Sequence, residues 1–309
     1  MDPQVDLGAM SATAGNPVQG QSSVQVPAAE AANPSTGDAF PDPWWWIAGA
    51  LLVLLVLVYR WRRSRPDPDR FERKYELPVR AVVPRGGRQH PEEEGLLAVV
   101  APDDVAVQGM RSLRTALHLS MGEGGNRVVA ILSRRAGAGC SFVAANLAAV
   151  LAEGGKRVLL LDGDLRNGSL HRQFGLADGC GLAELLSGDA GVGSVICGTG
   201  VKRLELIPAG GPPANPEELL GGRRFALLLQ RLGAYDHIVI DTSPLATGDG
   251  ALAAARLADV ALMVVKGRRG AGPGIARLRH EKIALHGVVF NRVRLPARRG
   301  RDGRRFGYA

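Results

Sequence analysis

The chain is poor in cysteine and in aromatic residues. Only three of its 309 residues are cysteines, Cys140, Cys180 and Cys197, so any disulfide pairing leaves one thiol free. Their separation also lacks the spacing of metal ligands, which argues against a disulfide framework or a zinc site and indicates a reducing compartment. Aromatic residues make up 5% of the chain, so a core must consist mainly of Ala, Val, Leu and Ile. Such residues favour buried parallel strands.

Lysine and arginine are absent before Arg60, although the whole chain has a net charge of +8. Two segments after that point are strongly basic, Arg60–Arg65 and Arg298–Arg305. Residues 1–42 are rich in Pro, Gly, Ser, Ala and Gln and bury too little apolar surface to offset the entropy of ordering, so we predict a disordered segment there. Because no basic region precedes the later apolar stretch, a cleaved signal peptide is not expected.

Charged side chains are also absent between Trp44 and Tyr59, within PWWWIAGALLVLLVLVYRWRR. Aromatic residues flank this apolar run and arginines follow it on one side only, a pattern typical of a membrane span. We therefore predict a transmembrane helix over residues 43–61, with residues 1–42 outside and everything after Arg60 in the cytosol. Arg60–Arg65 would then attract anionic lipid. A buried core helix is the alternative, but it does not explain the one-sided arginines.

The remaining sequence divides into a cytosolic linker (62–101), a domain (102–295) and a basic tail (296–309). The linker contains one candidate strand at residues 76–83. The strands expected in the domain are Val128–Ser133, Arg157–Asp164, Leu204–Gly210, His237–Ser243, Val260–Gly267 and Leu285–Val293. Helical segments are expected between them, including residues 105–120, 141–155 and 216–233. This alternation predicts an α/β fold whose mostly parallel sheet is covered by helices on both faces.

A glycine-rich turn follows the first expected strand and leads into a helix, in SRRAGAGCSFVAANLA. A phosphate loop (P-loop), GxxxxGK[ST], cradles phosphates with backbone N–H groups, while its lysine contacts the β and γ oxygens and its hydroxyl binds Mg²⁺. Here Gly137 and Gly139 supply the flexible backbone, and Ser141 is placed for magnesium. However, Cys140 stands in place of the lysine and Arg134 in place of the first glycine. Taken alone, this segment is also compatible with an ordinary glycine turn.

Carboxylates mark the ends of two further strands. Asp162 and Asp164, in LLLDGDLR, point to the same side of an extended chain, and Asp241 follows the apolar strand of IVIDTSP. Ligands of open parallel sheets bind at the carboxyl ends of the strands. Carboxylates there can hold magnesium through water or accept a proton from an attacking hydroxyl. A polar turn that caps the next helix is the structural alternative for the first pair.

These motifs occur together in an order that resembles the bacterial protein-tyrosine kinases of capsule and exopolysaccharide chain-length control, relatives of the MinD and ParA ATPases. The resemblance covers residues 103–293 and includes RSLRT, LLLDGDLR, GLAELLSG, LIPAGGPPANPEELL, YDHIVIDTSPL and GVVFNRV. It implies a P-loop NTPase fold that binds ATP and Mg²⁺, in a protein of the bacterial inner membrane.

The resemblance also implies roles for particular residues. Asp162, Asp164 and Asp241 would be the catalytic carboxylates, and Ser141, Asp164 and Asp241 would bind the metal. Asn291 would contact the nucleotide base, unless it is simply a polar strand end, and Tyr308 would be the only phosphoacceptor in the tail. The phosphate-binding segment would comprise Arg135, Ala136, Gly137, Ala138, Gly139, Cys140, Ser141 and Phe142.

Two departures from the family pattern bear on activity. The interface helix of the family begins with Glu-x-x-Arg-x-x-Arg, and this chain has Gln108, Arg111 and Arg114 there, so an intersubunit ion pair is lost and ring assembly is in question. Cys140 cannot stabilise charge on the phosphates, which is most of phosphoryl-transfer catalysis. Arg135 lies where MinD-type relatives carry an additional lysine, and we hypothesise that it partly replaces the missing cation.

The sequence thus leaves two functions open. The first is a membrane-anchored, tyrosine-kinase-like ATPase that controls polysaccharide chain length or export. The second is a pseudokinase that partners a membrane chain-length determinant, or polysaccharide copolymerase, without turnover. A ParA-like positioning ATPase is disfavoured by the predicted span and by LLLDGDLR, and no nucleic-acid partner is expected.

Overall fold

The computed structural model describes residues 43–63, 68–85, 96–121, 127–266 and 271–293. The long helix α1 (Pro43–Arg63) crosses the division of the chain into two units, which falls between Leu54 and Leu55. Its apolar side chains from Trp44 to Tyr59 are largely exposed. Within the described parts of the chain, however, we find no helix with the length and apolar character needed to span a membrane. The expected disordered segment over residues 1–42 lies outside the described residues.

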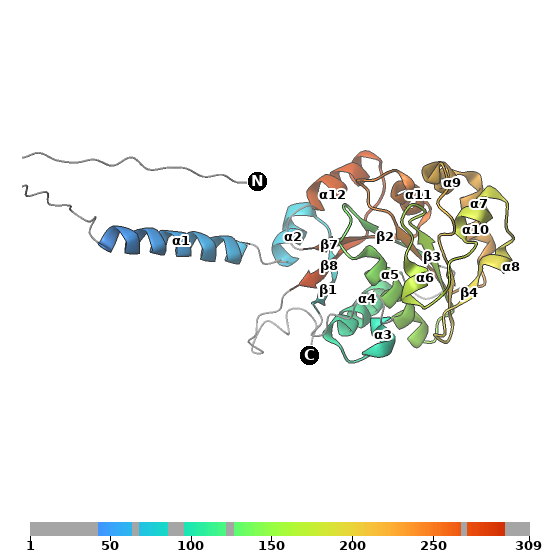
Figure 1. Cartoon of the computed structure of the whole chain (residues 1–309), viewed down its shortest axis with the longest axis horizontal. Coiled ribbons are helices and arrows are strands. Elements are labelled where there is room, and N and C mark those ends of the chain that lie inside the picture. Colours follow the sequence, from blue (N-terminus) through green and yellow to red (C-terminus); the bar gives the residue numbers. More distant parts are fainter. Residues whose placement is uncertain (1–42, 64–67, 86–95, 122–126, 267–270, 294–309) are drawn as a thin grey trace, which may run out of the picture. The chain divides into compact units, whose positions relative to one another are not determined.

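An eight-stranded sheet forms the centre of the domain, in the order β1-β8-β7-β2-β6-β3-β5-β4 (Figure 1). Its pairs are parallel apart from β4 with β5. The strands are β1 (Val79–Pro84), β2 (Arg127–Ser133), β3 (Val158–Gly163), β4 (Cys197–Gly198), β5 (Leu204–Ile207), β6 (His237–Thr242), β7 (Val260–Lys266) and β8 (Gly287–Val293). Each strand expected in the domain is therefore present, and the predicted α/β fold with a mostly parallel sheet is confirmed.

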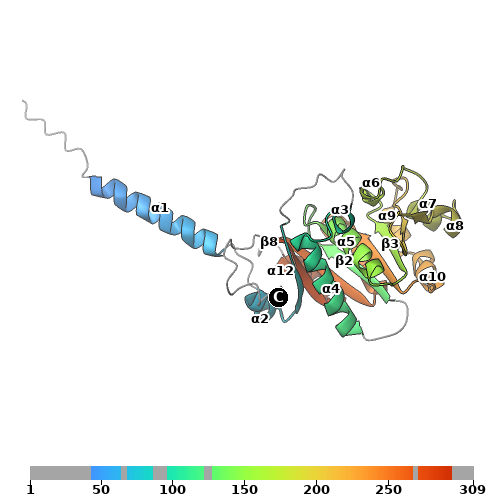
Figure 2. The ribbon, with the colours of Figure 1, turned by 90° about the horizontal axis from the view of Figure 1, so that it is seen from below.

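Helices cover both faces of the sheet, because alternate residues of each buried strand face opposite sides and nearly all of them are apolar. One face packs against α3 (Leu97–Val100), α4 (Val105–Met121) and α5 (Cys140–Glu153). The other packs against α2 (Pro68–Tyr75), α11 (Gly250–Leu257) and α12 (Ala271–His280) at one end of the sheet. Figures 1 and 2 show α3 to α5 on one side of the strands, and Figure 1 shows α11 and α12 on the other.

A third buried cluster covers the other end of the sheet. It includes α7 (Leu182–Ser187), α9 (Pro216–Gly221) and α10 (Arg223–Arg231). Two short helices complete the fold, α6 (Leu170–Gln173) and α8 (Val192–Val195). The single helical segment expected over residues 216–233 is broken, because Gly222 adopts an extended conformation between α9 and α10.

The predicted linker over residues 62–101 is wrong for much of its length. Strand β1 pairs with β8 at the edge of the sheet, and Phe71 of α2 packs edge-to-face on Phe290 with ring centroids 5.2 Å apart. Leu97 of α3 is buried on the opposite face. These segments are short, and α2 is rich in charge, so only their packing against distant strands identifies them as part of the domain.

Candidate active site

The glycine-rich turn connects the carboxyl end of β2 to the amino terminus of α5. Gly137 and Gly139 have φ angles of +75° and +88°, which are strained for residues with a side chain. Arg135, Ala136 and Gly137 are exposed to solvent. The turn is therefore an open strand-to-helix connection, and the helix of 14 residues behind it directs its unpaired N–H groups and positive end toward the turn.

Cys140 points into the protein rather than toward the open side of this loop. Its thiol is buried and donates a hydrogen bond to the carbonyl oxygen of Ile131 in β2, with 3.0 Å between Sγ and O. Burial, and then the negative charge of Asp241, raise the pKa of Cys140 well above its usual value. The thiol is therefore neutral, and it supplies no charge to the loop.

The two strand-end carboxylates Asp162 and Asp241 lie side by side on the adjacent strands β3 and β6. Both are fully buried, on the face of the sheet that packs against α5. Among the described residues, the Oδ1 atom of Asp241 has no hydrogen-bond partner, and the Ser141 side chain is near enough to lower the pKa of the same carboxyl group. Burial, and then the charge of Asp162, raise the pKa of Asp241 to about 8. No lysine stands at position 140 to balance these acids.

Asp162 is held more firmly by its backbone neighbours. The N–H of Leu170 donates to its Oδ2 at 3.0 Å, and the N–H of Asp164 donates to its Oδ1 at 3.3 Å. Burial raises its pKa to about 6 despite the hydrogen bond from Leu170. Asp164 is only partly buried and accepts the N–H of Asn167, and burial raises its pKa too. The fold thus brings the predicted carboxylates to the carboxyl edge of the sheet, beside the glycine-rich turn.

Asn291 also lies at this edge, at the end of β8. Its side chain is buried, and its Nδ2 donates to the carbonyl oxygen of Ala138 in the glycine-rich turn at 3.0 Å. The predicted contact of Asn291 with a nucleotide base stays a prediction, and the structure gives this amide a partner within the chain.

The residues predicted for an oligomer interface lie on α4. Gln108 is exposed, whereas Arg111 pairs with Glu153 of α5 at 2.8 Å and Arg114 donates to the carbonyl oxygen of Val150 at 2.9 Å. Both arginines therefore contact α5 of the same chain. Phe142, the last residue predicted to contact nucleotide, is half-buried against the core, and Tyr308 lies outside the described residues.

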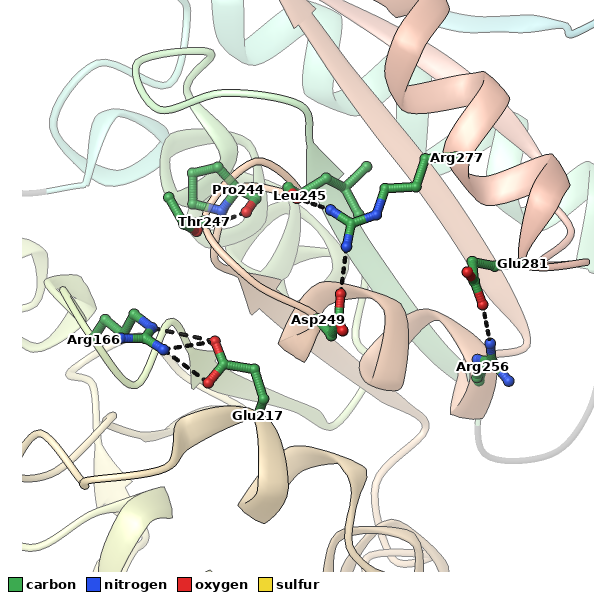
Figure 3. Close-up of polar contacts among 9 residues, drawn as sticks. All are labelled: Arg166, Glu217, Pro244, Leu245, Thr247, Asp249, Arg256, Arg277 and Glu281. Carbon is green, nitrogen blue, oxygen red and sulfur yellow. Dashed lines mark hydrogen bonds and ion pairs between the residues drawn. The ribbon is translucent and has the colours of Figure 1, made fainter.

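Three side-chain contacts that the sequence analysis did not predict brace the loops at this edge. Arg166 binds Glu217 through both carboxylate oxygens at 2.8 Å, which ties the turn after Asp164 to the start of α9 (Figure 3). Arg277 of α12 pairs with Asp249 and donates to the carbonyl oxygen of Leu245, in the loop that follows Asp241 (Figure 3).

The third contact involves Glu184 of α7. Its carboxylate accepts the N–H of Gly181 at 2.7 Å and the N–H of Gly211 at 2.9 Å, and these bonds hold its pKa below the usual value although burial opposes them. Glu184 lies in the segment GLAELLSG and Glu217 in the segment PAGGPPANPEELL. Both segments were singled out in the sequence, and the structure shows which groups these acidic residues contact. Their roles could not be read without the fold that joins them.

Two further observations concern metal-binding clusters and cavities near the site. In the described ranges, we find no cluster of three or more His, Cys, Asp and Glu side chains arranged around a metal position. A cavity of about 460 Å³ lies at the other end of α5, away from the glycine-rich turn, between Ala98, Ala152, Glu153, Val201 and Lys202. It includes none of the residues predicted for the active site.

Comparison with known proteins places the chain in a family. Residues 126–286 match the AAA domain family. The chain is 40% identical over 215 residues to the tyrosine-protein kinase ptk of Acinetobacter johnsonii, a stretch that covers 66% of this chain and 29% of that protein. It spans about a third of the length of the curated relatives that it matches.

Two solved structures cover most of the described domain. The BceF tyrosine kinase domain is 36% identical with a TM-score of 0.67, and the alignment covers 74% of this chain and 99% of that one. The kinase domain of the Escherichia coli tyrosine kinase ETK is 30% identical with a TM-score of 0.68, over 74% of this chain and 95% of that one. The strand-end carboxylates, the glycine-rich turn and these matches agree, and the chain belongs to the AAA domain family and, within it, to the bacterial protein-tyrosine kinases.

Proposed function

We propose that this chain is a membrane-anchored, tyrosine-kinase-like ATPase that binds Mg-ATP and regulates the chain length or export of an extracellular polysaccharide. One observation carries the proposal. Asp162 and Asp241 are buried next to each other beside a P-loop, and the Oδ1 atom of Asp241 has no partner in the part of the chain that the structure describes. Leaving such an atom without a partner costs about 1–3 kcal/mol or more, so the pair needs a reason beyond folding, and a hydrated magnesium ion supplies one.

The residues fit a magnesium nucleotide. Backbone N–H groups of the loop and the amino terminus of α5 would hold the phosphates. Ser141, Asp164 and Asp241 would hold Mg²⁺ directly or through water, which requires few protein ligands because the phosphates supply the others. Bound magnesium would neutralise charge on the phosphates. Asp162 would accept the proton of an attacking tyrosine hydroxyl, the step that a catalytic carboxylate performs in phosphoryl transfer.

The proposal extends to partners and location. Its partner would be a membrane chain-length determinant, or polysaccharide copolymerase, and self-association through α4 would form a ring. The exposed apolar surface of α1 and the arginines from Arg60 support anchoring in the bacterial inner membrane next to anionic lipid. If the chain is so anchored, alkaline carbonate will leave it in the membrane pellet. Its release into the supernatant would refute the anchor.

The test of function is a calorimetric titration of the full chain, in detergent, with Mg-ATP. We expect a dissociation constant in the micromolar range, about −8 kcal/mol. Arg135 is exposed beside the loop, and Arg135→Ala should weaken binding about 10-fold, the value of one charge-assisted hydrogen bond. Arg231→Ala, at an exposed position on α10, is the matched control. Unchanged affinity in Arg135→Ala would end the hypothesis that Arg135 replaces the missing lysine.

A second experiment separates an active kinase from a pseudokinase. After incubation with Mg-ATP, mass spectrometry should find phosphate on Tyr308 in the wild-type chain and none in Asp162→Asn or Tyr308→Phe. The inward orientation of Cys140 favours the pseudokinase as the second candidate function, because nothing at that position touches phosphate. Nucleotide binding without phosphate on Tyr308 or any other tyrosine would select it.

A further inference from the structure

Asn291 connects the end of β8 to the glycine-rich turn. Its side chain is 1% exposed, and its hydrogen bond to Ala138 joins residues 153 positions apart in the chain. Its other polar atom is occupied as well, because the N–H of Arg292 donates to Oδ1 at 2.8 Å. This second bond fixes the orientation of the amide group, so that Nδ2 is the donor that faces the turn.

The contact constrains one peptide group of the turn. The carbonyl oxygen of Ala138 and the N–H of Gly139 belong to the same planar trans peptide, so they point in opposite directions. With the carbonyl held by Asn291, the N–H of Gly139 points away from β8. A side chain on Gly139 would overlap Nδ2 of Asn291, and its φ of +88° also requires glycine. The Asn291 side chain can therefore occupy this position only because residue 139 is a glycine.

We propose that Asn291 is a positioning residue, which holds the Ala138–Gly139 peptide so that the Gly139 N–H faces the phosphates. This rests on the proposed function. Because Cys140 faces Ile131 and carries no charge, the backbone N–H groups of the turn supply a larger share of phosphate binding here than in a loop with lysine. The orientation of one peptide then has a large effect on affinity. The proposal therefore predicts that loss of the Asn291 side chain weakens binding of the polyphosphate itself.

Binding of two ligands to Asn291→Leu tests this assignment. Leucine matches asparagine in size but donates no hydrogen bond. We expect the affinities for Mg-ATP and for inorganic tripolyphosphate with Mg²⁺ to fall by the same factor, about 10-fold. Thr199→Val is the matched control, since it removes a buried hydroxyl that donates to Leu204 away from the turn. If ATP binding weakens while tripolyphosphate binding is unchanged, Asn291 recognises the base and the proposal is wrong.

A second measurement does not depend on any ligand. Gly139→Ala should lower the melting temperature strongly in the wild-type chain and less in Asn291→Ala, because the smaller side chain leaves room for the added methyl group. The φ strain is present in both backgrounds and cancels in the comparison. Equal losses would overturn the proposal. If the wild-type chain binds neither ligand, the proposed function fails, and this cycle still decides whether Asn291 holds the turn.

Discussion

Cys140→Lys is expected to tighten the binding of Mg-ATP by about 10- to 100-fold. An ammonium group at this position can form charge-assisted hydrogen bonds with the β and γ phosphates, each worth about 1.5–3 kcal/mol. The position suits a cation, because Asp241 already acts on the Cys140 thiol and lacks a partner for its Oδ1 atom. The lysine would therefore also stabilise the ligand-free site. Calorimetric titration of the wild-type and variant chains with Mg-ATP measures the effect.

Cys140→Ser is the matched control, since its hydroxyl can still donate to Ile131 but carries no charge. It should bind Mg-ATP as the wild-type chain does. If lysine gains no more affinity than serine, the missing cation does not limit binding, and the neutral residue at position 140 has been compensated elsewhere in the loop. Melting temperatures of both variants must accompany the titrations, because Cys140 is buried.

Asp241→Asn is expected to stabilise the ligand-free chain at pH 8, by on the order of 3 kcal/mol, while abolishing the effect of magnesium on nucleotide binding. The folded state raises the pKa of Asp241 from 3.8 to about 8, chiefly by burial. Between these values the folded chain keeps a proton that the unfolded chain has released. Raising the pH from 4 to 8 therefore lowers the free energy of unfolding, and an asparagine, which does not titrate, removes this loss.

Urea denaturation at pH 5 and pH 8 measures this difference. The wild-type chain should lose stability over that range, and Asp241→Asn should lose less, with the remainder due to Asp162, whose pKa is raised to about 6. Asp189→Asn, at an exposed position, should follow the wild-type chain. If the wild-type chain is equally stable at both pH values, the buried carboxylates do not carry the proposed protons.

The sequence predicted most of the central sheet, because its strands are continuous apolar runs that no surface element would contain. The prediction failed where the local residue pattern does not identify an element or its end, and where only packing against distant segments determines it. The candidate strand at residues 76–83 corresponds to β1 (Val79–Pro84), but the sequence assigned it to a linker, and only its pairing with β8 shows that it belongs to the sheet. The break between α9 and α10 lies at Gly222, inside a segment whose apolar pattern continues across it.

For the site, the sequence identified the residues but not their partners. The positions of Asp162 and Asp241 follow from the parallel sheet, since strands of one direction end at one edge. The inward turn of Cys140 and the bond between Asn291 and Ala138 do not, because a residue pattern gives no side-chain direction within a loop. Arg166 and Glu217 lie 51 residues apart, and their pairing depends on the fold that brings α9 to the turn.

The two edges of the sheet limit how copies of this chain can associate. A long, flat edge strand offers its unpaired N–H and C=O groups to the next molecule and promotes aggregation. Here one edge is β4, which has only two residues, and the other is β1, which ends at Pro84 and carries Arg80 folded onto the carbonyl oxygen of His286. Neither edge is suited to continue into a neighbouring sheet. Copies of this chain would therefore meet through helical surfaces and loops and not through a shared sheet.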